Sequence, residues 1–285
     1  MTRVPAAAES PGIQHAVRET FLKAAGPLLV KRIVEILEPR GIPVMPLKGV
    51  LLQKLVYGDK AFRPIVDVDV LVPEERFFEA WRLLRANGFT GEQWEIGRWQ
   101  VTLRNPDGPP LGIDLHRRLT RTVRSRLTEA ELFARGRPDS GMFGAPVILP
   151  SPDDLFAHLL LHATLHWLRV SRLHRPGDFQ AAADALGLDA VRCAAHLARV
   201  GLTAHARLML PMIAEETTSP FVEHLLTRLD PAVRGYAAAW LAGALAARSP
   251  PGRAGRRLAN VALAPSLPAA LFAAARDRLS RYREG

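Results

Sequence analysis

The stretch that decides the fold runs from Val44 to Val72 and reads VMPLKGVLLQKLVYGDKAFRPIVDVDVLV. A short apolar strand at its start leads through Lys48 and Gly49 into a helix, and the stretch closes on a second strand, DVDVLV. That second strand carries Asp67 and Asp69 one residue apart, although its other residues are apolar. Because burying a charge is costly unless it is paired or bound to a metal, the pattern indicates a functional site.

The two carboxylates of this strand predict a metal site. Residues two apart in a strand point to the same face, so Asp67 and Asp69 project together. Neighbouring carboxylates repel one another unless a divalent cation lies between them, and oxygen ligands suit Mg²⁺ or Mn²⁺. Asp114, in the apolar strand LGIDLHR, is the expected third carboxylate. We predict that all three are catalytic metal ligands for displacement at phosphorus, the alternative being acids on a solvated edge strand.

The residues around Lys48 predict a phosphate-binding turn. A helix that begins through glycine presents free N–H groups to phosphate, which assigns Gly49 to nucleotide binding. Lys48 adds a positive charge for the triphosphate, and Arg63 is a candidate second cation. For both cations the alternative is an ordinary surface side chain. His116 shares the face of Asp114 and is expected to contact phosphate or acceptor, or else to hydrogen-bond a neighbouring strand.

Three histidines form a stripe on one predicted helix, at His158, His162 and His166. Their spacing of four residues puts them on one helix face. We expect the stripe to line a cleft between the two halves of the chain. The alternatives are core packing with satisfied ring nitrogens and a zinc site, although no glutamate lies between the histidines as it does in a metalloprotease helix.

The order of predicted elements indicates an α+β fold. Strands and helices alternate to about residue 90, hairpin strands follow, and a strand at APVILP ends near Pro150. Everything after Ser151 reads as helical, with helices expected around 152–170, 178–186, 189–200, 202–215, 219–228, 231–247 and 267–282. We therefore divide the chain into a disordered tail (1–12), a mixed-sheet core with flanking helices (13–150) and an all-helical domain (151–285).

The composition is that of a globular protein with a strong positive charge. Among 285 residues, 38 Lys and Arg against 28 Asp and Glu give a formal charge of +10. This charge favours anionic partners such as nucleotides or RNA, unless it reflects only an arginine-rich composition. A single cysteine, Cys193, excludes an intrachain disulfide. With no secretory signal and no apolar run near 20 residues, we expect a cytoplasmic protein without a membrane span.

The motifs together resemble the uncharacterised nucleotidyltransferase family of the polymerase-beta-like superfamily. Its members carry Leu-Lys-Gly, an arginine, Asp-Ile-Asp-Leu-Leu-Val and a downstream Asp-Leu-His-Trp. The matching positions here are Lys48, Gly49, Arg63, Asp67, Asp69, Asp114 and His116. The resemblance covers residues 40–120 well and the helical half only through SPDDLFAHLLLHATLH. Arg117 replaces the aromatic residue after the histidine, which puts the base or acceptor contacts in doubt.

The resemblance implies a polymerase-beta-like core and Mg²⁺-dependent transfer of a nucleotidyl group from a nucleoside triphosphate such as ATP. It does not fix the acceptor, which we expect to be a small molecule, a peptide or a protein. One alternative is a toxin-like enzyme that acts on tRNA, which the positive charge supports. Another is a non-catalytic nucleotide-binding adaptor, which the intact carboxylates disfavour.

Overall fold

The structure is a computed structural model that describes residues 11–58, 63–93, 99–108, 111–119, 125–170 and 175–229. Its centre is a mixed sheet with the strand order β1-β2-β5-β4-β3. The bounds are β1 (Met45–Leu47), β2 (Asp67–Leu71), β3 (Thr90–Gly91), β4 (Gln100–Arg104) and β5 (Gly112–His116). β2 pairs with β1 antiparallel and with β5 parallel, while β4 is antiparallel to β5 and to β3. The prediction of an α+β fold with a mixed sheet is confirmed.

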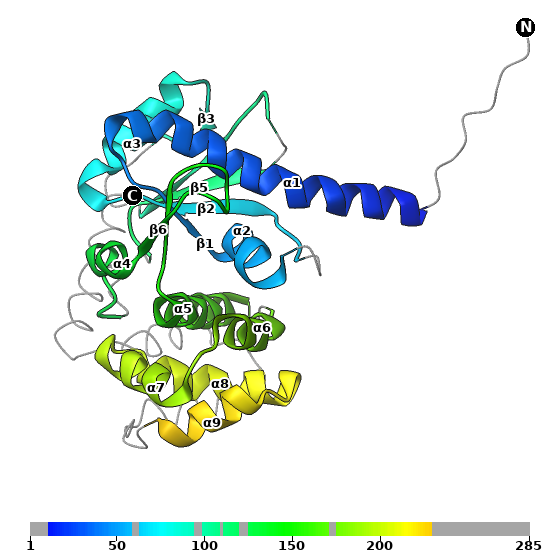
Figure 1. The fold of residues 1–285 in the computed structure, drawn as a ribbon, viewed down its shortest axis with the longest axis vertical. Coiled ribbons are helices and arrows are strands. Elements are labelled where there is room, and N and C mark those ends of the chain that lie inside the picture. Colours follow the sequence, from blue (N-terminus) through cyan, green and yellow to red (C-terminus); the bar gives the residue numbers. More distant parts are fainter. Residues whose placement is uncertain are drawn as a thin grey trace, which may run out of the picture.

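Two helices cover one face of this sheet, α1 (Pro11–Leu37) and α3 (Phe77–Ala86), and α2 (Lys48–Leu52) follows β1 (Figure 1). Short helical turns extend them, η1 (Glu38–Arg40), η2 (Gln53–Tyr57) and η3 (Glu74–Arg76). The alternation of β2 explains this arrangement. Val68 and Val70 are fully buried on the side opposite to the two aspartates, as the period of a strand requires.

The second half of the described chain is helical, as predicted. It comprises α5 (Pro152–Val170), α6 (Gly177–Leu186), α7 (Ala190–Arg199), α8 (Thr203–Thr217) and α9 (Pro220–Arg228). The helices predicted at 231–247 and 267–282 and most of the predicted tail lie outside the described residues, and α1 already begins at Pro11.

The sequence did not predict α4 (Glu129–Arg135) or the strand β6 (Arg137–Asp139), which pairs with β7 (Val147–Leu149). α4 begins with a capping box in which Thr128 and Glu131 bond reciprocally, a recognisable helix start.

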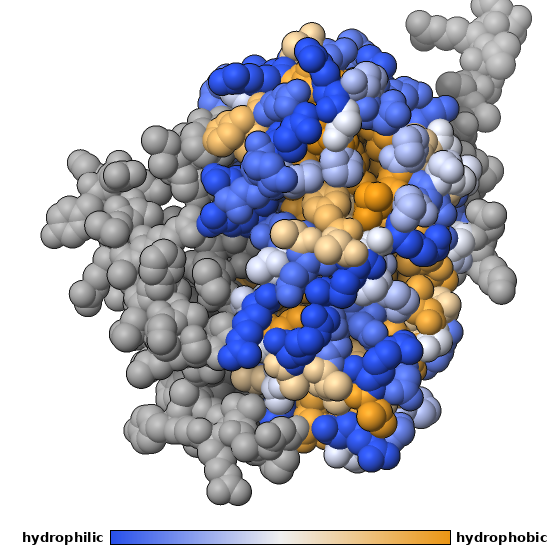
Figure 2. Space-filling model, turned by 60° about the vertical axis from the view of Figure 1, so that its left-hand side comes forward, coloured by the Kyte–Doolittle hydropathy of each residue, from blue (hydrophilic) through white to orange (hydrophobic). Residues whose placement is uncertain are grey.

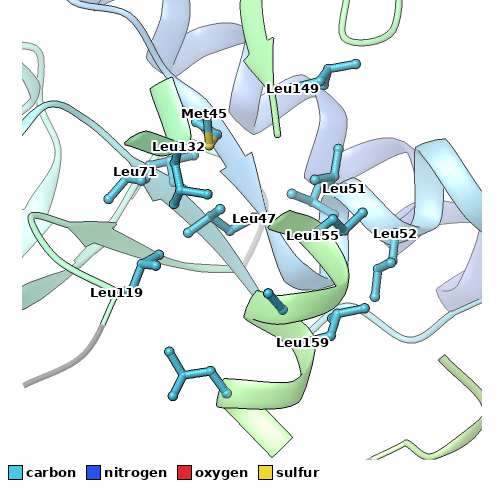
Figure 3. Packing of buried hydrophobic residues seen from close by; sticks show 14 of the residues in the cluster. Met45, Leu47, Leu51, Leu52, Leu71, Leu119, Leu132, Leu149, Leu155 and Leu159 are labelled. Carbon is cyan, nitrogen blue, oxygen red and sulfur yellow. The ribbon is translucent and has the colours of Figure 1, made fainter. Parts of the chain in front are cut away.

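The core continues from the sheet into the helical half. Leu155 and Leu159 of α5 lie near Leu47 and Leu52, which come from the β1–α2 segment (Figure 3). All four belong to one cluster of buried hydrophobic side chains. Apolar burial therefore holds the helices against the sheet, and the boundary at residue 150 stays a prediction about chain organisation.

On the face drawn in Figure 2, hydrophilic side chains interrupt the hydrophobic areas of the described surface. Among the described residues, none of the helices has the length and apolar content needed to cross a bilayer.

Candidate active site

Two of the predicted carboxylates lie side by side on neighbouring strands. The register of the parallel pair β2 and β5 places Asp69 opposite Asp114. Because β2 lies between β1 and β5, the alternative of acids on an edge strand is wrong. Ligand atoms of Asp69, Asp114 and His116 all lie within 4.8 Å of one another, so these side chains could hold a metal ion.

Asp67 is not part of this close group. Residues two apart on a strand lie about 6–7 Å from one another along the chain, which separates Asp67 from the group around Asp69. The sequence placed Asp67 in the metal set and His116 among the nucleotide contacts. Among the described residues, the geometry instead gathers His116 with the two central carboxylates, and the role of Asp67 as a ligand stays a prediction.

The carboxylate of Asp69 carries two polar partners. Its Oδ1 lies 2.5 Å from Lys48 Nζ and 2.8 Å from His116 Nε2. Asp69 is only 2% exposed. Burial alone would raise the pKa of Asp69, but the Lys48 ammonium and the hydrogen bond from His116 outweigh burial and hold that pKa well below its usual range. Asp69 is therefore an anion at neutral pH, and Lys48 is not an ordinary surface lysine.

The pKa of Asp67 is shifted in the opposite direction from that of Asp69. Burial raises its pKa to about 6, the negative charge of Asp69 adds to this rise, and Lys48 opposes it. Asp67 therefore holds its proton up to about pH 6 in the folded chain, whereas an unfolded aspartate loses its proton near 3.8. Because the pKa of Asp67 is higher in the folded chain, protonation of Asp67 stabilises the folded state. This stabilisation is complete below the pKa of the unfolded chain, 3.8, and it is lost as the pH rises through about 6.

This difference predicts a stabilising substitution. Asparagine cannot ionise, so Asp67→Asn should raise the melting temperature by a few degrees at about pH 8 without divalent cations, and by much less at about pH 4. The measurement is thermal unfolding at the two pH values, with the exposed Asp107→Asn as the matched control. A melting temperature that falls at the higher pH would contradict the electrostatic interpretation.

Asp114 is held by two residues that the sequence analysis missed. Its Oδ1 accepts a hydrogen bond from Thr102 Oγ1 at 2.7 Å, and its Oδ2 accepts one from Gln100 Nε2 at 2.7 Å. Thr102 lies opposite Asp114 in the β4–β5 pair, and Gln100 lies opposite His116. The polar residues that alternate with Val101 and Leu103 in QVTLR were the available signal. Both oxygens of Asp114 are thus fixed by neutral donors.

Arg63 is buried in an ion pair with the helical half. Its Nη2 lies 2.7 Å from Asp178 Oδ2, its Nε donates to the same carboxylate, and Tyr57 donates its hydroxyl to Asp178 at 2.7 Å. A Cβ placed on Gly49 would lie 2.9 Å from Arg63 Nη1. Glycine at position 49 therefore leaves room for the guanidinium. This explanation differs from the predicted one, in which Gly49 allows phosphate to approach the backbone. The sequence pattern alone does not indicate this partner for Arg63, because Asp178 lies at the start of a helix far along the chain.

The histidine stripe divides into a buried and a half-buried part. His158 is 4% exposed, and burial lowers its pKa to about 3, with Lys48 and His116 adding to the effect. His158 is therefore a neutral imidazole close to the Lys48–Asp69 pair. His162 and His166 are half-buried with ring centroids 6.3 Å apart. The close metal-ligand group found in the described part of the chain does not include these three histidines, and their place in a cleft stays a prediction.

Comparison with known proteins identifies related sequences and shapes. The family model described as an uncharacterised nucleotidyltransferase matches residues 4–217. No curated protein matches the chain. The solution structure of the antibiotic-resistance factor ANT(2'')-Ia aligns with a TM-score of 0.44 and 16% identity, over 61% of this chain and 89% of that one. The crystal structure of ANT(2'')-Ia in complex with adenylyl-2''-tobramycin aligns with a TM-score of 0.43 and 14% identity, over 61% and 95%.

Proposed function

The chain belongs to the uncharacterised nucleotidyltransferase family, and on this premise we propose that it transfers a nucleotidyl group from a nucleoside triphosphate to an acceptor, with release of pyrophosphate. The observation that carries the proposal is the juxtaposition of Asp69 and Asp114 on parallel strands, with the ammonium of Lys48 bound to Asp69. Paired carboxylates beside a fixed cation are the groups that a metal-bound triphosphate needs.

The donor set fits a divalent cation. Asp69 and Asp114 supply carboxylate oxygens, and a ring nitrogen of His116 lies within 4.8 Å of both. Carboxylates suit Mg²⁺ and Mn²⁺, and Asp67 is the proposed further carboxylate. When bound, the cation would polarise the phosphoryl group and neutralise charge on the departing pyrophosphate. The Nδ1 atom of His116 is buried without a hydrogen-bond partner among the described residues, which supports a role of this side chain in ligand binding.

The residues of the chain then have separate tasks. Lys48 attracts the triphosphate by its charge. His116 orients Asp69 through the bond from Nε2, and Arg63 supports the turn at Gly49 by packing against it. Asp114, oriented by Thr102 and Gln100, accepts the proton of the acceptor hydroxyl at a carboxylate oxygen.

The test is incubation with each common nucleoside triphosphate, labelled on the α-phosphate, in the presence of Mg²⁺ or Mn²⁺. We expect cation-dependent pyrophosphate release and label on an acceptor in small-molecule, peptide or protein fractions. Parallel reactions with tRNA test the alternative of a tRNA-directed enzyme. Transfer of label to tRNA alone would show that the acceptor is tRNA and not a small molecule, peptide or protein. Nucleotide binding without pyrophosphate release in every fraction would contradict the enzymatic proposal and favour the adaptor.

A further inference from the structure

The ion pair between Lys48 and Asp69 engages a carboxylate that the proposed divalent cation would also use. Asp69 Oδ1 receives both the Lys48 ammonium at 2.5 Å and His116 Nε2 at 2.8 Å. The Lys48 side chain is 15% exposed and that of Asp69 is 2% exposed, so little water screens the pair. The carboxylate of Asp69 is thus neutralised by a cation of the chain itself.

The backbone of Lys48 is held in a strained conformation. Its φ is 46°, in the left-handed region that residues other than glycine seldom adopt. Such strain persists only where the surroundings determine the conformation, and it concentrates at ligand-binding and switch positions. Lys48 opens α2 directly after β1, so its backbone is fixed between two regular elements while its side chain reaches β2. The strain and the short ion pair are independent observations at one residue.

Arg63, the other candidate cation, and Asp114, the other carboxylate of the close group, each have partners outside the Lys48–Asp69 pair. The guanidinium of Arg63 is bound to Asp178, and Asp114 is satisfied by the neutral donors Thr102 and Gln100. Within the described chain, Lys48 is thus the cation whose ammonium contacts the close carboxylate group. A divalent cation at Asp69 would lie next to this ammonium, and two positive charges on one carboxylate repel one another.

We propose that Lys48 is a built-in counter-ion that competes with the divalent cation for Asp69 and moves to the triphosphate when nucleotide binds. This inference rests on the proposed function and adds a regulatory role to its site. With no nucleotide, Lys48 keeps metal affinity low. A triphosphate attracts the ammonium away from Asp69 and thereby raises the affinity for the metal. Because such coupling is reciprocal, the metal must raise nucleotide affinity by the same factor.

The experiment measures the binding of Mn²⁺ alone, by calorimetry or by electron paramagnetic resonance of the free ion. In Lys48→Gln the competing charge is absent, and we expect Mn²⁺ to bind about tenfold or more tightly than in the unmodified protein without nucleotide. Lys48→Gly serves as a second variant, because glycine adopts a positive φ without strain. Lys54→Gln is the matched control, since Lys54 is exposed and undergoes the same chemical change.

Nucleotide provides the second readout. Both Lys48 variants should bind a non-hydrolysable nucleoside triphosphate more weakly than the unmodified protein does. The nucleotide should also raise their Mn²⁺ affinity by a smaller factor than it raises that of the unmodified protein. Mn²⁺ binding that is unchanged or weaker in both Lys48 variants overturns the counter-ion proposal. Asp69→Asn distinguishes the two levels of inference, because retention of Mn²⁺ binding in that variant would refute the metal site itself. Loss of binding there, with no gain in the Lys48 variants, refutes only the role of Lys48.

Discussion

Asp69→Asn is expected to reduce nucleotidyl transfer by on the order of a thousandfold or more, because it removes a proposed metal ligand, and such a ligand contributes several kcal/mol to the transition state. Asp69 is central to the site, since its carboxylate is close to Asp114 and bonds both Lys48 and His116. Asparagine keeps the shape of the side chain but lacks the charge, so the fold should survive while the chemistry fails.

The stability of this variant should change in the opposite direction from that of Asp67→Asn. Asp69 is a stabilised anion whose pKa is held low by Lys48 and His116 against the effect of burial, whereas burial raises the pKa of Asp67. Removing the charge of Asp69 leaves the Lys48 ammonium, 15% exposed, without its carboxylate. We therefore expect a lower melting temperature for Asp69→Asn and a higher one for Asp67→Asn at about pH 8.

The measurements are the rate of pyrophosphate release per folded molecule, with folding followed by circular dichroism. Asp107→Asn removes one charge from an exposed turn and serves as the control. If Asp69→Asn retained a rate within about tenfold of the unmodified protein, the assignment of Asp69 as a metal ligand would be wrong.

The sequence could predict those parts of the site that depend on local periodicity. The shared face of Asp67 and Asp69 follows from the strand period, and the strand-to-helix change at Lys48 follows from the pattern around VMPLKGVLL. The apolar strand LGIDLHR indicated Asp114 as the third carboxylate and placed His116 on the same face, and both positions also match the family resemblance. The mixed sheet then confirmed that Asp114 lies beside Asp69.

The remaining contacts depend on chain segments that are far apart in sequence. Arg63 and Asp178 are separated by 115 positions, and nothing in the local pattern of either segment identifies the other. Arginine is abundant in this chain, and an acid in the first turn of a helix is common for electrostatic reasons. Only the packing of the helical half against the sheet brings the two side chains together, so their pairing could not be predicted.

Breaking this buried pair is expected to have the largest effect on stability. The side chains of Arg63 and Asp178 are only 8% and 7% exposed, and two guanidinium nitrogens bond the carboxylate. Removing one partner leaves a buried charge without compensation. Asp178→Asn and Arg63→Met should therefore each lower the free energy of unfolding by about 3–5 kcal/mol in chemical denaturation.

A double-mutant cycle distinguishes pairing from simple packing. The variant with both Arg63→Met and Asp178→Leu leaves no isolated charge, so its loss should be much smaller than the sum of its two single substitutions. The matched control is Asp153→Asn, which breaks the pair with Arg192, where the arginine is 57% exposed. That substitution should change stability by no more than about 1 kcal/mol, since solvent screens exposed pairs.

The same pair also connects the helical half to the proposed site. Arg63 Nη1 would lie 2.9 Å from a Cβ at Gly49, so the guanidinium packs directly against the residue that follows Lys48. If Asp178 holds the guanidinium there, Asp178→Asn should also weaken nucleotide binding in the folded fraction, as measured by titration with a non-hydrolysable nucleoside triphosphate. In the double-mutant cycle, additive losses in the free energy of unfolding would show that Arg63 and Asp178 act independently. If folded Asp178→Asn binds nucleotide with normal affinity, the ion pair contributes to stability alone, because the turn at Lys48 would then keep its geometry without the ion pair.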